Sequence, residues 1–213
     1  TVIDCPGSGE DASSVIDSCM VQDPGTGRVY VLIDHFPGGI GQPNCWASTG
    51  FDEHGRRLLR DLDDGRYVVE PDGAVTTIEG QATEFRVLDD GTVLRDGNPA
   101  GNIELAPGAD PAETLLAIPT SYLQIAHSDD DGVTWSKPRD LNPQLKQPWM
   151  RFLGTCPGNG IALRNDPHAG RLIVPLYFNN DQNWLAMCAT VAYSDDHGET
   201  WQLGHGPNEG RQT

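Results

Sequence analysis

Short apolar runs alternate with turn-forming residues along most of the chain. One pair of runs flanks the sequence DPGTG at residues 23–27, which predicts a β-hairpin around residues 17–33. Two later runs, residues 122–126 and 187–193, are similarly apolar and predict strands. No amphipathic pattern is longer than about two helical turns, and residues 112–117 are the best short helix candidate. The pattern as a whole predicts an all-β protein with short connections.

An eight-residue sequence follows each of these two later runs. Residues 128–135 are SDDDGVTW and residues 194–201 are SDDHGETW, so both fit S-x-D-x-G-x-T-W. Ser and Asp side chains organise turns through nearby backbone groups, Gly supplies a positive φ, and Trp begins a new extended segment. One copy would be an ordinary acidic turn, but two copies predict a repeated β-hairpin unit. The predicted structural residues are Ser128, Asp130, Gly132, Thr134, Trp135, Ser194, Asp196, Gly198, Thr200 and Trp201.

The middle of the chain has a different character. Charged residues become frequent between residues 45 and 105, and Asp-Gly pairs recur at positions 64–65, 72–73, 90–91 and 96–97. Each pair is flanked by short β-prone runs, which predicts a hairpin-rich meander. We therefore divide the chain into a propeller blade segment (1–44), an inserted β subdomain (45–105) and propeller blades that carry both octets (106–213). Radial repetition of small sheets, as in a β-propeller, suits this pattern better than a closed sandwich.

Composition and charge narrow the possible partners. The 213 residues include 25 Gly and 16 Pro, and the formal net charge is −17. This acidity argues against a nucleic-acid partner and against binding to an anionic membrane surface. No apolar run approaches the length of about 18 residues that a membrane-spanning segment requires. The chain begins at Thr1 without a Met or a signal-like segment, so we expect a processed product or a piece of a longer protein.

The sequence predicts neither a metal site nor a cofactor. Its five cysteines include Cys5, Cys19 and Cys45 near the beginning, where one disulfide or a set of buried thiols is equally compatible with the spacing. No C-x-x-C pair occurs, and no His pair has the spacing of helical metal ligands. The acidic octets also lack the ligand spacing of an EF-hand loop.

The octets and their flanking segments resemble the Asp boxes (BNR repeats) and neighbouring sequences of bacterial exo-α-sialidases, also called neuraminidases. The matching segments are residues 16–17, 21–24, 122–135, 149–154, 157–161, 167–172 and 193–201. The resemblance implies part of a six-bladed β-propeller with an inserted small β subdomain. It also implies a glycosidase that hydrolyses terminal α-linked sialic acid from glycoconjugates. The expected partners are sialylated glycans and the remainder of the sialidase polypeptide, and the expected location is secreted or at the cell surface.

The catalytic residues that the resemblance implies are not found in this chain. Sialidases bind the substrate carboxylate with three arginines and use a Tyr nucleophile in a retaining mechanism, together with a Glu and an Asp acid/base. The first arginine belongs to an Arg-Ile-Pro segment that this sequence lacks, and the Glu, the Tyr and the other arginines follow the second octet in the family. Structural roles are therefore expected for Arg164 and Arg171. The segment alone is predicted to be inactive.

The resemblance assigns three residues of this chain to the substrate site. Asp17 matches an acidic residue near the family site, whereas Ile40 and Tyr177 match an apolar wall and an aromatic residue of the pocket for the N-acetyl group. Simple core packing is the alternative for Ile40 and Tyr177. Met187 occupies a position where relatives carry a polar amide, and Phe178 or Trp184 could replace that contact.

Two other functional classes remain open from the sequence. One is a non-catalytic glycan-binding propeller, and the other is a sialidase-like transferase, including one that forms an anhydro product. The residues quoted above do not separate these from a hydrolase.

Overall fold

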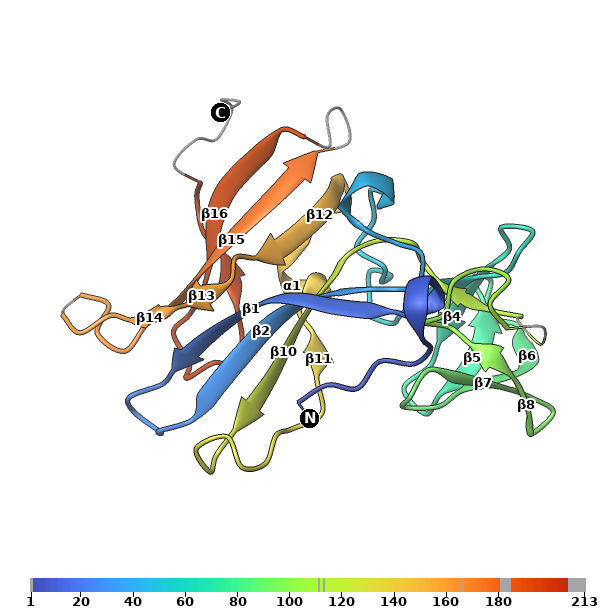
Figure 1. The fold of residues 1–213 in the computed structure, drawn as a ribbon, viewed down its shortest axis with the longest axis horizontal. Helices are drawn as coiled ribbons and strands as arrows, with labels where there is room; N and C mark the ends of the chain where they lie inside the picture. Colours follow the sequence, from blue (N-terminus) through green and yellow to red (C-terminus); the bar gives the residue numbers. More distant parts are fainter. Residues whose placement is uncertain (1, 111, 113, 166, 181–184, 207–213) are drawn as a thin grey trace.

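Short strands assembled into three sheets make up the chain (Figure 1). The computed structural model describes residues 2–110, 112, 114–165, 167–180 and 185–206. Two 3-10 helices (Gly9–Asp11 and Gln42–Asn44) and the four-residue helix α1 (Asn142–Leu145) are the helical elements of this described part. The predicted all-β fold class is confirmed.

The first sheet contains the predicted hairpin. Its strands lie in the order β11-β10-β2-β1, and each neighbouring pair is antiparallel. The strands are β1 (Ser14–Gln22), β2 (Val29–Phe36), β10 (Tyr122–Ser128) and β11 (Arg139–Asp140). The short strand β13 (Gly158–Asn159) adds to this sheet in parallel with β1. The hairpin around residues 17–33 and the strand at 122–126 are therefore confirmed.

The second sheet repeats this four-stranded arrangement. Its order is β12-β15-β16-β17, again with antiparallel neighbours. The strands are β12 (Met150–Thr155), β15 (Leu172–Asn180), β16 (Met187–Ser194) and β17 (Gln202–Leu203), with β14 (Ile161–Ala162) beside β15. Two consecutive four-stranded antiparallel sheets are the building units of a β-propeller.

The third sheet is a meander between β2 and β10 of the first sheet. It has the order β8-β7-β6-β5-β4-β3-β9 and lies beside the first sheet, on the right in Figure 1. Its strands are β3 (Leu58–Arg60), β4 (Arg66–Val69), β5 (Ala74–Thr77), β6 (Ala82–Val87), β7 (Thr92–Arg95), β8 (Asn98–Asn102) and β9 (Leu116–Ala117). The four Asp-Gly pairs occupy turns of this meander, and Asp96 and Gly97 both have positive φ. The helix predicted over residues 112–117 is wrong at residues 116 and 117, which form strand β9 and pair with β3.

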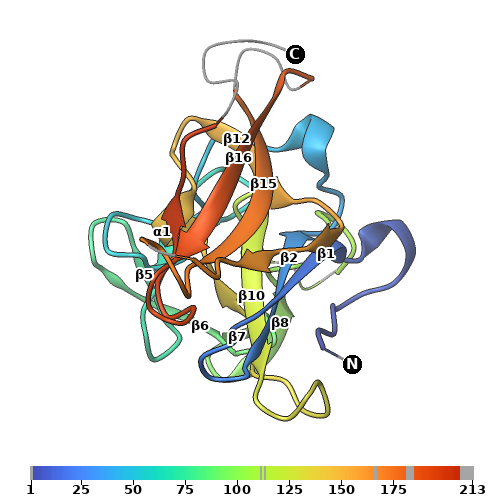
Figure 2. The same cartoon turned by 90° about the vertical axis from the view of Figure 1, so that its left-hand side faces the viewer.

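The first and second sheets share one apolar core, and Figure 2 shows the second sheet crossing in front of the first. The buried residues of this core are Cys19, Val21, Tyr30, Leu32, Leu123, Ile125, Leu141, Leu145, Met150, Leu153, Leu172, Val174, Leu176, Ala192 and Trp201. A separate smaller core lies within the third sheet, around Leu59, Val75 and Val93. The meander thus has apolar packing of its own.

The two octets connect the third and fourth strands of the first and second sheets. In the first octet, Ser128 Oγ accepts a hydrogen bond from the Gly132 amide (2.8 Å), and the Asp130 carboxylate accepts from the Thr134 amide (2.8 Å) and hydroxyl (2.6 Å). The second octet repeats the same bonds at 2.8, 2.9 and 2.6 Å. In both, the Trp Nε1 donates to the Gly carbonyl at 3.0 Å. These closed local networks account for the spacing of the motif.

The β1–β2 turn links the two octets. Arg28 donates two hydrogen bonds to Asp129 in the first octet (2.7 and 3.2 Å) and one to Glu199 in the second (3.3 Å). Asp23, which is fully buried, lies 2.9 Å from the His197 ring nitrogen. The octets therefore take part in joining the first and second sheets.

The two octet tryptophans should contribute unequally to stability. Trp201 is 2% exposed within the shared core, whereas Trp135 is only partly buried. We expect Trp201→Ala to lower the free energy of unfolding by about 3–5 kcal/mol, and Trp135→Ala by about 1–2 kcal/mol. Urea denaturation of both variants at one pH measures the difference. Equal losses would contradict the unequal burial.

Candidate functional site

The three residues assigned to the substrate site approach one another in the structure. Asp17 lies in β1, Ile40 follows β2, and Tyr177 lies in β15. The Tyr177 hydroxyl is 3.5 Å from Asp17 Oδ2. Ile40 and Tyr177 both pack against the same small cluster of Phe36, Cys45 and Phe152. Side chains from the first and second sheets therefore meet at this point.

A β-bulge presents Asp17. The register of β1 against β2 shifts between Ile16 and Cys19, and Asp17 has a φ of 54°. A bulge leaves residues without a cross-strand partner and redirects their side chains, and bulges are frequent beside active sites. A positive φ is uncommon for a non-glycine residue, although Asp tolerates it better than most. The local backbone thus sets where the Asp17 carboxylate points.

Aromatic rings form the apolar side of this site. Phe36 and Phe152 stack with their centroids 6.0 Å apart, and Phe152 and Tyr177 are 4.8 Å apart. Burial is the main cause that raises the pKa of Tyr177, and the nearby carboxylates of Asp34 and Asp17 add to it. The Tyr177 phenol therefore stays protonated at neutral pH and can donate a hydrogen bond.

A second carboxyl group, not singled out by the sequence, lies beneath these residues. Asp34 in β2 is fully buried, and its Oδ1 accepts a hydrogen bond from the Thr155 amide (2.7 Å). Its Oδ2 has no hydrogen-bond partner among the described residues. Burial raises the pKa of Asp34 to about 8, so the group is a neutral acid at pH 7.

Met187 is partly buried at the edge of the site, and the sequence did not reveal its partner. The Gln42 amide Nε2 lies 3.8 Å from the Met187 sulfur. An amide side chain is thus present beside Met187, supplied by a different segment of the chain. Phe178 packs edge-on against Trp149, with centroids 5.6 Å apart. Trp184 lies outside the described residues.

The arginines near these strands make structural contacts. Arg171 donates two hydrogen bonds to Asp195 (2.7 and 2.8 Å) and lies 4.3 Å from the Tyr193 ring centroid. Arg151 donates to the backbone carbonyls of Cys45 (2.7 Å) and Pro43 (3.1 Å). Arg164 is exposed. The structural role predicted for Arg171 agrees with its contacts.

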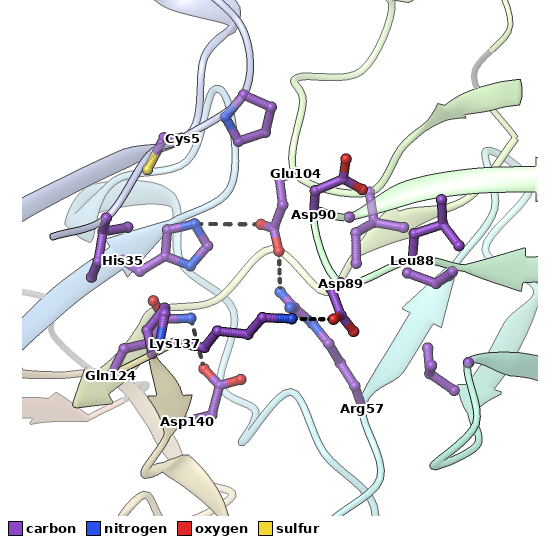
Figure 3. Close-up of a pocket in the computed structure, with 18 of the residues that line it drawn as sticks. Cys5, His35, Arg57, Leu88, Asp89, Asp90, Glu104, Gln124, Lys137 and Asp140 are labelled. Carbon is purple, nitrogen blue, oxygen red and sulfur yellow. Dashed lines mark hydrogen bonds and ion pairs between the residues drawn. The ribbon is translucent and has the colours of Figure 1, made fainter. Parts of the chain in front are cut away.

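A cleft of about 1170 Å³ lies between the third sheet, the first sheet and residues 2–6 (Figure 3). Its floor carries buried polar side chains from both sheets. Arg57 Nη2 forms an ion pair with Glu104 Oε1 at 2.7 Å, and His35 Nε2 lies 3.5 Å from Glu104 Oε2. Gln124 donates to Asp140 at 3.1 Å. The guanidinium of Arg57 also lies 4.7 Å from the ring centroid of Tyr122 in β10.

Two of these contacts join the third sheet to the first: His35 with Glu104, and Arg57 with Tyr122. Burial lowers the pKa of His35 and raises that of Asp140, so both groups favour their neutral forms. Arg57 stays charged, with Glu104 as its ion-pair partner. A buried ion pair fixes the relative position of the groups that carry it, because separating the partners leaves a buried charge uncompensated.

No metal-binding cluster, disulfide or membrane-spanning helix is found among the residues that the structure describes. In the part of the chain that the structure describes, no group of three or more His, Cys, Asp or Glu side chains is arranged to hold a metal ion. All five cysteines are free thiols, and Cys19 and Cys45 are buried. None of the helices within the described ranges has the length and apolar character needed to cross a membrane.

This chain is similar in sequence to known sialidases. Residues 110–213 match the family described as BNR repeat-like domain. The anhydrosialidase of Macrobdella decora is 32% identical over 219 residues, which cover 90% of this chain and 28% of that protein. Sialidase B of Streptococcus pneumoniae is 28% identical, over 90% of this chain and 30% of that protein. The chain thus spans less than a third of these two curated relatives.

The fold agrees with the sequence comparison. The crystal structure of the intramolecular trans-sialidase from Ruminococcus gnavus, in complex with oseltamivir carboxylate, superposes with a TM-score of 0.76 at 29% identity. The match covers 92% of this chain and 45% of that one. The four-stranded sheets and the meander between β2 and β10 are thus features that this chain shares with sialidase β-propellers.

Breaking the Arg57–Glu104 ion pair, which joins the segments before β3 and after β8, should destabilise the protein. We expect Glu104→Gln to lower the free energy of unfolding by about 3 kcal/mol, because Arg57 is left buried without its ion-pair partner. The double variant Arg57→Met/Glu104→Leu removes both charges and should lose less than the single variant. Denaturant titration of the three proteins measures this. A double variant that is less stable than Glu104→Gln would contradict the cost assigned to an uncompensated Arg57 charge.

Proposed function

Because this chain is a homologue of sialidases over most of its length, we propose that it forms part of the catalytic domain of a sialidase. That enzyme releases terminal α-linked sialic acid from glycoconjugates. The observation that carries the proposal is the convergence of Asp17, Ile40 and Tyr177 at one point of a sialidase fold. These residues come from segments far apart in the sequence, so their convergence depends on the fold.

The chemistry of these residues suits one part of the substrate. The carboxyl oxygens of Asp17 accept hydrogen bonds from the hydroxyl or amide groups of a sugar. Ile40 and the Tyr177 ring offer an apolar wall to the methyl group of the N-acetyl substituent. The Gln42 amide beside Met187 adds a polar group at the same edge. Together they form a surface for recognising the uncharged substituents of sialic acid.

The carboxylate of sialic acid requires a different set of groups. A planar guanidinium binds a carboxylate through two hydrogen bonds and stays charged at all relevant pH values. Arg151, which lies near the site, is engaged by two backbone carbonyls. The proposal therefore assigns the three arginines, the Tyr nucleophile, the Glu and the Asp acid/base to parts of the polypeptide outside this chain. The net charge of −17 makes such a local cationic pocket necessary.

An intramolecular transfer reaction is the second candidate. It is favoured by the names of two relatives, the anhydrosialidase of Macrobdella decora and the intramolecular trans-sialidase of Ruminococcus gnavus. In this reaction a hydroxyl group of the sialic acid itself, rather than water, would attack the anomeric carbon and give an anhydro sugar. Both candidates share the substrate and differ in the product. Under either one, sialylated glycans are the partners, and secretion or display at the cell surface gives access to them.

The activity and its product can be tested together. We expect the full-length protein to release the fluorophore from a fluorogenic sialoside, and this chain expressed alone to release none. Mass spectrometry of the sugar separates hydrolysis from intramolecular transfer, because the anhydro product is lighter by one water. A full-length protein that binds sialosides without turnover would instead support the glycan-binding alternative, and turnover by the chain alone would refute the assignment of catalytic residues elsewhere.

The role of Ile40 can be tested separately. We expect Ile40→Ala to raise KM about tenfold with little change in kcat, because a lost apolar contact weakens binding by about 1–3 kcal/mol. Ile78→Ala, an exposed position on the third sheet, is the matched control. If Ile40→Ala lowers thermal stability and leaves KM unchanged, Ile40 is a packing residue only.

A further inference from the structure

We infer that Asp34, fully buried beneath the proposed substrate site, is a positioning residue that holds the Asp17 bulge in its binding geometry through Thr155. The inference rests on the proposed function, since it assigns Asp17 to substrate binding. It adds that ionisation of Asp34 disturbs this geometry and weakens substrate binding.

The first step is the contact between Asp34 and Thr155. Asp34 belongs to β2 in the first sheet, and Thr155 is the last residue of β12 in the second sheet. Both the amide (2.7 Å) and the hydroxyl (3.3 Å) of Thr155 lie within hydrogen-bond distance of Asp34 Oδ1. Asp34 thereby fixes the end of β12 against the first sheet.

The second step leads from Thr155 to the bulge. The Thr155 hydroxyl donates a hydrogen bond to the backbone carbonyl of Asp17. Asp17 has no paired residue in the β1–β2 ladder, which resumes only at Cys19. The carbonyl of Asp17 is partly buried and lacks a ladder partner, and Thr155 supplies a hydrogen bond in its place. The same residue that Asp34 holds therefore also holds the backbone from which the Asp17 carboxylate projects.

The Asp34 carboxyl group packs closely against Gly154 in β12. Gly154 precedes Thr155, and a Cβ atom placed on it would lie 2.2 Å from Asp34 Oδ2. Since Gly154 does not have a positive φ, its lack of a side chain is needed for space and not for backbone conformation. The carboxyl group fits between β2 and β12 only because this position is glycine.

The groups around Asp34 would not compensate a negative charge on it. The titratable groups that face Asp34 are Asp17 from β1, Cys156 after β12 and Tyr177 from β15. None of these groups is a cation. An ionised Asp34 would add a negative charge at a fully buried position beside Asp17, where repulsion between carboxylates is only weakly screened. Displacement of Asp17 relieves that repulsion, and the Tyr177–Asp17 contact is lost with it.

The raised pKa of Asp34 should make both the stability of the protein and its affinity for substrate fall as pH rises. The pKa of Asp34 is about 8 in the folded protein and about 3.9 in an unfolded chain. Between these values the folded state binds more protons, so the free energy of unfolding falls as pH rises through this window. Substrate affinity falls near the upper end, where folded Asp34 ionises.

The experiment compares the full-length protein with three variants. Asp34→Asn keeps an oxygen acceptor for Thr155 but cannot ionise, and Thr155→Val removes the hydroxyl that contacts Asp17. Asp140→Asn is the matched control, because Asp140 is a partly buried acid on the floor of the cleft with a raised pKa. KM and kcat for a fluorogenic sialoside are measured from about pH 5 to pH 9, and urea denaturation covers the same range.

We expect KM of the wild-type and Asp140→Asn proteins to rise several-fold above about pH 8, and KM of Asp34→Asn to lose that rise. Thr155→Val should raise KM about tenfold across the pH range with kcat nearly unchanged, because the displaced Asp17 binds substrate less well. The pH-dependent loss of stability should become shallower in Asp34→Asn, with the remainder due to other buried acids such as Asp140. A wild-type pH profile of KM in Asp34→Asn overturns the inference, and so does an unchanged KM in Thr155→Val.

Failure of the proposed function can be distinguished from failure of the inference about Asp34. A protein that turns over no sialoside refutes that function, while the denaturation series still reports on Asp34. In that case, a slope in Asp34→Asn as steep as that of the wild-type protein overturns the neutral-acid assignment, and a shallower slope supports it.

Discussion

The packing of the first sheet against the second is the interaction on which the rest of the structure depends. Both sheets contribute buried apolar side chains to one core, and hydrophobic burial of this kind is the main stabilising contribution to a fold. The candidate site is assembled across the same contact, because Asp17 comes from one sheet and Tyr177 from the other. Small changes in this packing therefore alter the geometry of the site directly.

Polar side chains buried along this contact show what the packing requires. The Lys146 Nζ atom has four oxygen neighbours, at 2.7, 2.9, 3.0 and 3.1 Å, and Asn142 exchanges hydrogen bonds with three backbone groups. Buried polar groups normally find such partners because an unpaired one is destabilising. The Oδ2 atom of Asp34 has none among the described residues. This atom lies next to the residues proposed to bind substrate, whereas His35, Arg57 and Glu104 carry further such atoms at the floor of the cleft.

The sequence predicted the features that depend on local pattern. Alternating turn signals were enough for the β1–β2 hairpin, for β10 and β16, and for the Asp-Gly turns of the meander. The burial of Asp34 was not predictable, because β2 is buried along nearly its whole length and shows no alternation that would assign its faces. The Arg57–Glu104 ion pair and the Gln42–Met187 contact were also not predictable from the sequence. Both join segments whose proximity follows only from the tertiary packing.

The register of the strands separates the octets from the candidate site. Ser128 pairs with Val29 at one end of β2, whereas Phe36, which contacts the site, lies at the other end. In the second sheet, Ser194 pairs with Leu172 at the beginning of β15, and Tyr177 lies further along the same strand. A substitution in an octet therefore acts on the site only through the sheets between them. The most recognisable sequence motif of this chain thus supports the fold, and the chemistry is carried by residues with no motif of their own.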